Sequence, residues 1–270
     1  MISTLPMLTL MFPNIDPVMV SFGPLAIRWY ALSYVAGILL GWWLATRLNR
    51  VTPSAFSEPA MDNVMVWIVF GILLGGRIGY VLFYNAGYYL ENLSEVYKPW
   101  HGGMSFHGGM IGVILAMFLM CKRYKLQFWP VIDIAAVVTP IGLGLGRIAN
   151  FINGELYGRI SNAPWAMVFP GDPFARHPSQ LYEAFLEGLV LLFIMLFSFR
   201  SEKIRTKPGT LSGIFLVGYA SFRAFVEFFR EPDVQIGFIA NAITMGQVLC
   251  IPMLLLGLYL ILRDWPRRTA

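Results

Sequence analysis

Seven long apolar stretches, separated by polar connections, constrain this sequence more than any other feature. They lie at about 27–46, 62–83, 107–121, 129–150, 178–199, 210–228 and 242–262. A helix of about 20 apolar residues crosses the hydrocarbon core of a bilayer. Charged residues make up 13% of the chain, whereas soluble domains carry about 25%. The sequence therefore predicts an all-α integral membrane protein with seven transmembrane helices, and it excludes an ordinary soluble enzyme.

The 20 lysine and arginine residues are distributed unevenly over the connections. One alternating set of connections and the C-terminal end hold Arg47, Arg50, Lys122, Arg123, Lys125, Arg200, Lys203, Arg205, Lys207, Arg263, Arg267 and Arg268. The other set holds Lys98, Arg159, Arg176 and Arg230. Because cytoplasmic loops are rich in Lys and Arg, we expect the N-terminus outside and the C-terminus in the cytoplasm. The same loops explain the net charge of +5, so no nucleic-acid partner is expected.

Two regions outside the seven stretches are expected to have their own places in a single membrane domain over 1–270. Residues 1–26 are apolar but are interrupted by Pro6, Pro13 and Pro17. This pattern predicts a segment at the membrane interface, with no cleaved signal peptide. Residues 151–177 are rich in Pro, Gly and aromatic residues and are expected to form a small head on the outer side. Glycines also recur at a spacing of four, which predicts close packing of helices. These are Gly37 and Gly41, Gly71, Gly75 and Gly79, Gly108 and Gly112, and Gly142 and Gly146.

Ionisable residues inside or at the ends of the apolar stretches point to a polar interior. They are Arg28, Arg77, Asp133, Arg147, Glu155, Glu183, Glu187, Arg223 and Glu227. Each such group costs about 2.5–3.5 kcal/mol to insert, so these groups usually face a partner or a cavity. Arg223 and Glu227 are four residues apart and are expected to form a pair. Guanidinium groups bind phosphate oxygens through two parallel hydrogen bonds. Arg147 and Arg223, near the outer ends of their stretches, therefore suit a phospholipid headgroup phosphate.

Two short segments carry the remaining candidate chemistry. In residues 101–112, glycines surround His107, which is expected to act as a proton acceptor or as a hydrogen-bonding anchor. Residues 146–159 combine arginine, asparagine and glutamate side chains in a turn-rich stretch. The three histidines have no metal-ligand spacing, so no metal site is expected. Cys121 and Cys250 lie in or beside apolar stretches, and no disulfide framework is predicted.

Five motifs of this chain, in order, resemble those of a known family. They are RWYALSY (28–34), SFHGGMIG (105–112), GRIANFINGELYGR (146–159), RHPSQLYE (176–183) and FRAFVEFFREPD (222–233). They resemble the prolipoprotein diacylglyceryl transferases of bacterial inner membranes, and the resemblance extends from about residue 20 to residue 262. Ala149 stands where the family signature often has glycine, and the segment from Arg159 to His177 is short for the family.

The resemblance implies a multi-pass enzyme of the bacterial inner membrane with its active site toward the periplasm. The family transfers the sn-1,2-diacylglyceryl group of phosphatidylglycerol to the lipobox cysteine of a prolipoprotein signal peptide. A thioether forms and glycerol phosphate leaves, without a cofactor or a metal. By position, the family's functional residues correspond to Tyr30, His107, Arg147, Asn150, Glu155, Gly158, Arg223 and Glu227.

The nucleophile in this reaction is the substrate's own thiol, which must lose its proton. We assign His107 as the general base, with Tyr30 as the alternative, and spacing does not distinguish them from solvent. Asn150 is expected to hold headgroup or ester oxygens, and Gly158 to keep the backbone clear of the lipid.

The departing phosphate gains negative charge during the reaction. Arg147 and Arg223 are expected to stabilise this charge, while Glu155 and Glu227 orient the two guanidinium groups. Buried charges and glycine-packed helices also suit a transporter or channel, although that class needs a polar path across the whole bilayer. A non-catalytic protein that holds anionic lipid is the second alternative.

Overall fold

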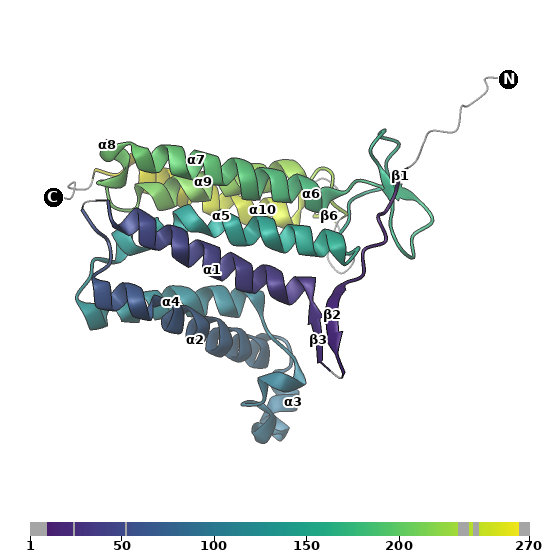
Figure 1. The fold of residues 1–270 in the computed structure, drawn as a ribbon, viewed down its shortest axis with the longest axis horizontal. Coiled ribbons are helices and arrows are strands. Elements are labelled where there is room, and N and C mark those ends of the chain that lie inside the picture. Colours follow the sequence, from purple (N-terminus) through teal and green to yellow (C-terminus); the bar gives the residue numbers. More distant parts are fainter. Residues whose placement is uncertain (1–9, 24, 52, 232–237, 240–242, 265–270) are drawn as a thin grey trace. The chain divides into compact units, whose positions relative to one another are not determined.

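The computed structural model describes residues 10–23, 25–51, 53–231, 238–239 and 243–264 (Figure 1). The helices are α1 (Trp29–Asn49), α2 (Glu58–Phe83), α3 (Ala86–Glu91), η1 (Leu93–Glu95), η2 (Pro99–His101), α4 (Phe106–Tyr124), α5 (Phe128–Ile152), α6 (Ser179–Glu183), η3 (Ala184–Val190), α7 (Leu191–Arg200), α8 (Glu202–Arg205), α9 (Thr210–Val226) and α10 (Met245–Leu262). The strands are β1 (Leu10–Met11), β2 (Val18–Phe22), β3 (Leu25–Arg28), β4 (Met167–Val168), β5 (Ala175–Arg176), β6 (Phe238–Ile239) and β7 (Ile243–Thr244).

Six helices in the described part of the chain are long and apolar enough to cross a membrane. They are α1, α2, α4, α5, the continuous helical stretch Ser179–Arg200 and α10. A helix satisfies its own backbone hydrogen bonds, and this is what the lipid interior requires. All seven apolar stretches coincide with helices, so the prediction of a helical membrane protein is confirmed. The stretch at 210–228 corresponds to α9, which is apolar but has only 17 residues.

The described residues form two compact units, one from the chain up to Ala45 and from Ala135 onward, the other from Thr46–Ile134. In the second unit α2 and α4 lie side by side (Figure 1) and meet through glycines. A Cβ added to Gly71 would lie 2.8 Å from the Gly112 carbonyl oxygen. One added to Gly79 would lie 2.7 Å from Gly108 Cα. No side chain fits at these positions, so the predicted close approach of these helices is confirmed.

Arg77 in α2 serves the backbone rather than a ligand. Its Nε donates to Val96 O at 2.8 Å, and its Nη2 donates to Glu95 O at 2.5 Å. Its Nη1 donates to the carbonyls of Gly102 and Gly103 at 2.5 and 3.1 Å. The buried guanidinium therefore fastens the connection between α3 and α4, and its charge is satisfied by carbonyl dipoles. Arg77 therefore faces a partner, as expected for a charged residue in an apolar stretch, and this partner is the backbone.

In the first unit, glycine contacts bring α5 against η3 and α9 against α10. A Cβ on Gly188 would lie 2.6 Å from Gly144 Cα. A Cβ on Gly213 would lie 2.7 Å from the Gly257 carbonyl oxygen. Close helix axes let short-range polar contacts form between side chains of neighbouring helices. The Gly144–Gly188 contact lies one turn from the residues that form the site.

Short paired strands follow α5 within residues 151–177, and we call this part of the chain, together with β1, the head. β1 runs parallel to β4, and β4 pairs antiparallel with β5. Phe12, Phe151 and Phe169 pack against one another, with ring centroids 5.2–6.2 Å apart. Tyr157 stacks on Phe169 at 4.8 Å. These aromatic contacts tie the N-terminal strand to the end of α5.

Short strands, which the sequence did not predict, accompany the helices in the described residues. Residues 10–11 belong to the head sheet, and β2 and β3 form an antiparallel hairpin that leads into α1. Residues 1–9 lie outside the described residues. Strands of two residues depend on partners far away in the sequence, so local hydrophobic periodicity does not reveal them.

Candidate functional site

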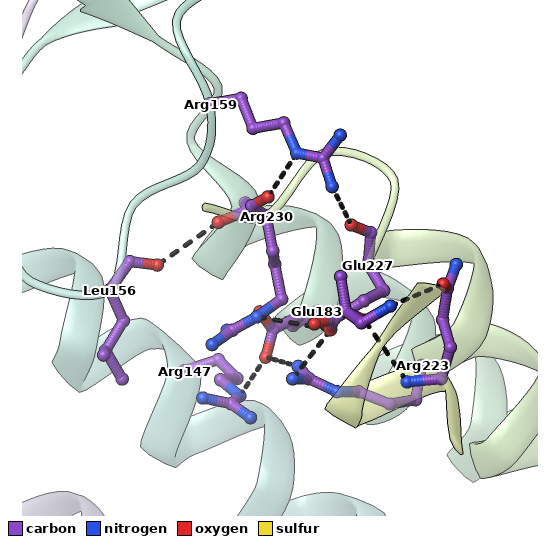
Figure 2. Close-up of polar contacts among 10 residues, drawn as sticks. Arg147, Leu156, Arg159, Glu183, Arg223, Glu227 and Arg230 are labelled. Carbon is purple, nitrogen blue, oxygen red and sulfur yellow. Dashed lines mark hydrogen bonds and ion pairs between the residues drawn. The ribbon is translucent and has the colours of Figure 1, made fainter. Parts of the chain in front are cut away.

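Glu183, at the end of α6, is the centre of the polar site (Figure 2). Its carboxylate has 0% exposure. Oε2 lies 2.5 Å from Arg147 Nε and 3.3 Å from Arg223 Nη1. Oε1 accepts a hydrogen bond from Arg230 Nη1 at 2.6 Å. A buried carboxylate needs such partners because its desolvation is costly. Three guanidinium groups therefore converge on one carboxylate.

A second carboxylate, Glu227, completes what we call the arginine cluster (Arg147, Glu183, Arg223, Glu227 and Arg230). Arg223, Glu227 and Arg230 are spaced by four and three residues, which places them on one face at the end of α9. Glu227 Oε2 lies 2.9 Å from Arg223 Nη2 and 3.5 Å from Arg230 Nε. The predicted pair of Arg223 and Glu227 is confirmed.

Gly246, in the first turn of α10, makes room for this second carboxylate. A Cβ added at Gly246 would lie 2.8 Å from both Cδ and Oε1 of Glu227. Any side chain there would displace the carboxylate from its two arginines. The position of α10 therefore helps to set the geometry of the cluster, which sequence analysis did not predict.

The loop that leaves α5 is tied to α6 through its backbone. Gly154 and Leu156 both have positive φ, of 65° and 57°, and for leucine this conformation is strained. Gln180 Nε2 donates to Glu155 O at 2.5 Å, and Ser179 Oγ donates to Leu156 O at 3.2 Å. The loop is thus fixed against the helix that carries the central carboxylate of the arginine cluster.

Glu155 does not orient a guanidinium group in the described structure, which corrects our prediction. Its Oε1 accepts hydrogen bonds from Asn150 Nδ2 at 2.8 Å and from Asn153 Nδ2 at 3.1 Å. Glu183 takes the orienting role that we assigned to Glu155. Asn150 is buried, whereas Glu155 is exposed. Glu155 therefore fixes the amide of Asn150 and keeps free acceptor capacity toward solvent.

The backbone around Gly158 explains why this residue is glycine. Its N–H donates to His177 O at 2.8 Å, and an added Cβ would lie 2.9 Å from His177 Cβ. Next to it, Arg159 donates from Nε to Arg230 O at 2.7 Å and from Nη2 to Glu227 O at 3.3 Å (Figure 2). Backbone packing therefore explains this glycine, and its predicted role in keeping the backbone clear of the lipid stays a prediction.

Gly146, directly before Arg147, faces open space instead of a neighbouring helix. A Cβ added to Gly37 would lie 3.1 Å from Gly142 Cα, so the Gly142 position packs against α1 as predicted. An added Cβ on Gly146 meets no described atom within 4 Å, which corrects the packing prediction for this glycine. The side chain of Arg147 keeps 21% of its surface exposed. The cluster is therefore approachable beside Gly146.

Tyr30 lies in the first turn of α1, in the same unit as the arginine cluster. Its hydroxyl lies 3.1 Å from that of Tyr34, and the two rings are 5.1 Å apart. Tyr30 is within electrostatic range of Arg147 and Glu155. His107 belongs to the other unit, where it lies exposed in the first turn of α4. The role of His107 as base therefore stays a prediction.

His177 fastens the head to the start of α6. Its Nδ1 lies 3.0 Å from Tyr182 Oη, which also accepts a hydrogen bond from Trp165 Nε1 at 2.7 Å. Burial lowers the pKa of His177 below its usual value, since a charged imidazole is poorly solvated there. Within the described residues, no group of three His, Cys, Asp or Glu side chains is placed to hold a metal ion.

Glu183 stood out in the sequence as a charged residue in an apolar stretch, but it was not assigned to the site. Arg230 was assigned only to an outer connection. The available signal was the cost of placing Glu183 in lipid, which demands a cationic partner. Its partners lie on α5, on α9 and just after α9, and helical spacing does not relate residues on different helices. The structure therefore supplies the pairing that the sequence lacks.

The arginine cluster has the features of a binding site for one anionic group. Three guanidinium groups share two carboxylates, and the arginine side chains keep 11–21% of their surface exposed. Arginine presents five donors in a planar fork, and each ion pair here uses only one or two of them. The unused donors are suited to the oxygens of a phosphate.

Comparison with known proteins gives consistent matches over nearly the whole chain. The family model for prolipoprotein diacylglyceryl transferase matches residues 17–263. The phosphatidylglycerol–prolipoprotein diacylglyceryl transferase of Rickettsia felis is 53% identical over 257 residues, which cover 95% of this chain and 99% of that protein. The protein of the same name from Agrobacterium fabrum is 56% identical over 260 residues, 93% of each chain. That from Rhodospirillum rubrum is 54% identical over 250 residues, 92% of this chain and 91% of its own length.

Proposed function

The chain belongs to the prolipoprotein diacylglyceryl transferase family, and from this premise we propose how its site performs the reaction. The protein transfers the diacylglyceryl group of phosphatidylglycerol to a prolipoprotein. The acceptor is the thiol of the lipobox cysteine at the end of the signal peptide. The products are a thioether-linked lipid on that cysteine and glycerol phosphate.

The observation that carries the proposal is the excess of one guanidinium group in the arginine cluster. Glu183 and Glu227 hold three arginines in place and leave one positive charge uncompensated among these five residues. The phosphodiester of phosphatidylglycerol carries one negative charge. Arg147 and Arg223 bind its oxygens. Arg230 pairs with the same two carboxylates, Glu183 and Glu227. The site is thus electrically complementary to the lipid headgroup.

The chemical step is a substitution at the glycerol carbon that bears the phosphate. The cysteine sulfur forms a bond to this carbon while the carbon–oxygen bond to phosphate breaks. The oxygen leaves with the electron pair as part of glycerol phosphate. Charge therefore builds on the phosphate in the transition state, where the fixed guanidinium groups of Arg147 and Arg223 stabilise it. Asn150, held by Glu155, is placed to bind a headgroup or ester oxygen.

The thiol proton goes to a base, which we assign to His107 with Tyr30 as the alternative. An imidazole accepts protons near neutral pH, which favours His107. Tyr30, in contrast, lies in the same unit as the arginine cluster and within electrostatic range of Arg147. Loss of transfer in His107→Gln with lipid binding intact would support His107. Full activity of this variant from about pH 6 to about pH 9 would mean that Tyr30 or solvent is the general base.

In the membrane, we place seven spans with the N-terminus in the periplasm and the C-terminus in the cytoplasm of a bacterial inner membrane. The seventh is α9, whose 17 residues measure about 25 Å at about 1.5 Å per residue. Glu227 and Arg230 extend it toward the outer surface, where the arginine cluster then lies. A cysteine introduced at Ser161 should react with an impermeant maleimide from outside, whereas one at Lys203 should not; the opposite pattern would reverse the orientation.

The function is tested by incubating the purified protein with phosphatidylglycerol and a lipobox peptide. We expect the peptide mass to rise by one diacylglyceryl group, with release of one glycerol phosphate. Arg147→Ala should abolish both signals. Arg200→Ala is the matched control, because Arg200 is an exposed arginine at the other end of the Ser179–Arg200 helical stretch. Tight lipid binding without any transfer would favour a lipid-binding protein instead of an enzyme.

A further inference from the structure

A third buried carboxylate, Glu187, adjoins the arginine cluster and has no role in the mechanism above. It lies four residues after Glu183, inside the π-helical stretch η3. Its exposure is 0%. Among the described residues, neither of its carboxylate oxygens has a hydrogen-bond partner. A buried carboxyl group without a donor is costly in its charged form, so its protonation state depends on the charges around it.

The groups that face Glu187 come from every element packed around it. They are Glu183 before η3, Arg147 on α5, Arg223 and Tyr219 on α9, Arg230 after α9 and Cys250 on α10. Glu183 repels a charge on Glu187, whereas the three arginines favour it. Tyr219 and Cys250 carry their own protons near neutral pH and have none to gain. Glu187 is therefore the group whose protonation state responds to the net charge of the arginine cluster.

Charge counting shows what a bound lipid changes. The five residues of the arginine cluster carry three positive and two negative charges. An ionised Glu187 makes the set of six neutral. A lipid phosphodiester adds one negative charge, so the same set would become negative in a poorly solvated interior. Protonation of one carboxylate restores neutrality, and such compensation is the usual response of buried ionisable groups.

Glu187 is the carboxylate that can accept this proton at least cost. Glu183 has contacts at 2.5, 2.6 and 3.3 Å with three arginines, and Glu227 has contacts at 2.9 and 3.5 Å with two. Protonation of either would weaken ion pairs that hold the arginines. Glu187 holds no arginine through a hydrogen bond. Its protonation leaves the phosphate-binding geometry unchanged.

We propose that binding of the anionic lipid is coupled to uptake of a proton by Glu187. This inference rests on the proposed function, because it takes the arginine cluster to be the phosphate site. Glu187 is a positioning residue that adjusts charge; it does not touch the lipid. Released glycerol phosphate and the proton then leave the site together, which returns the six residues to neutrality for the next lipid.

The test measures protons taken up when dioctanoyl phosphatidylglycerol binds to the full-length protein in detergent. Titration calorimetry in buffers of different ionisation enthalpy gives this number directly. We expect the wild-type protein to take up a proton, at most one per lipid, and to bind up to tenfold more weakly for each unit of rising pH. Glu187→Gln should take up none and should bind with an affinity that does not change with pH. Dioctanoylglycerol, which lacks the phosphate, is the control ligand and should bind without proton uptake.

Each remaining outcome contradicts a defined part of the reasoning. If the wild-type protein binds the phospholipid with no proton uptake at any pH, the proton coupling is wrong while the phosphate site stands. Equal uptake by the wild type and Glu187→Gln assigns the proton elsewhere and overturns the inference. If phosphatidylglycerol binds no better to the wild type than to Arg223→Ala, the proposed phosphate site fails and the inference fails with it. If Glu187→Gln does not fold, the wild-type measurement still decides whether lipid binding is coupled to proton uptake.

Discussion

Glu183→Gln is the substitution that tests the organisation of the site most severely. It keeps the size of the side chain and removes one negative charge from a residue with 0% exposure. Breaking a buried ion pair by removing one partner costs about 3–5 kcal/mol. Arg223 retains Glu227 at 2.9 Å, whereas Arg147 has no other carboxylate partner among the described residues.

The glutamine carbonyl recovers part of this loss, because a hydrogen bond to a charged group contributes about 1.5–3 kcal/mol. We therefore expect the free energy of unfolding to fall by about 2 kcal/mol. Arg147 also loses the ion pair that orients its guanidinium group toward the phosphate. We expect this to remove about 3 kcal/mol of transition-state stabilisation, which lowers the transfer rate by about 100-fold.

Denaturant unfolding in detergent and the peptide transfer assay measure the two effects. Glu202→Gln is the matched control, because Glu202 is an exposed glutamate at the start of α8. A Glu183→Gln protein that keeps the wild-type unfolding free energy within about 0.5 kcal/mol and transfers lipid at the wild-type rate would refute the central place of this carboxylate.

Three further predictions address other parts of the molecule. Gly246→Ala should displace the Glu227 carboxylate and lower the transfer rate while circular dichroism stays unchanged; wild-type activity would mean that Glu227 needs no fixed position. Gly75→Ala places a Cβ 2.7 Å from Gly112 Cα, and such overpacking costs about 1–3 kcal/mol, measurable as a lower thermal midpoint. The pKa of His177 is lowered by burial, so the unfolded chain binds more protons below about pH 6.5. Thermal midpoints should therefore fall on acidification, less steeply in His177→Asn; equal slopes would exclude this histidine as a cause.

The sequence revealed the helices well because their signal is local. Apolar stretches of span length end where charges or prolines begin, and the predicted stretch at 129–150 corresponds to Phe128–Ile152. The pair of Arg223 and Glu227 was equally predictable, because four residues along a helix bring two side chains together. The two-residue strands were not predictable, since their partners lie in remote segments.

The sequence pointed to most charged residues of the arginine cluster, but it did not show how they pair. Arg147 was identified because a charged side chain is costly to insert into a membrane and because it lies in one of the family motifs. Its partner Glu183 lies on another helix, and we assigned the orienting role to Glu155, which is nearer in sequence. The glycine contact between α5 and η3 brings Arg147 and Glu183 together. A single sequence does not show which glycines of two helices are in contact. The pairing of Arg147 with Glu183 was therefore visible only in the structure.

The central claim is that Arg147 and Arg223 bind the phosphate of the lipid. Solid-state NMR of the protein with labelled arginine side chains and bound dioctanoyl phosphatidylglycerol measures distances from phosphorus to guanidinium nitrogen. Direct hydrogen bonds predict nitrogen–phosphorus distances within about 4 Å that disappear in Arg147→Lys/Arg223→Lys, while Arg200→Lys leaves them unchanged. A lipid that binds with no such short distance, or with the same short distances in the double variant, would contradict the claim.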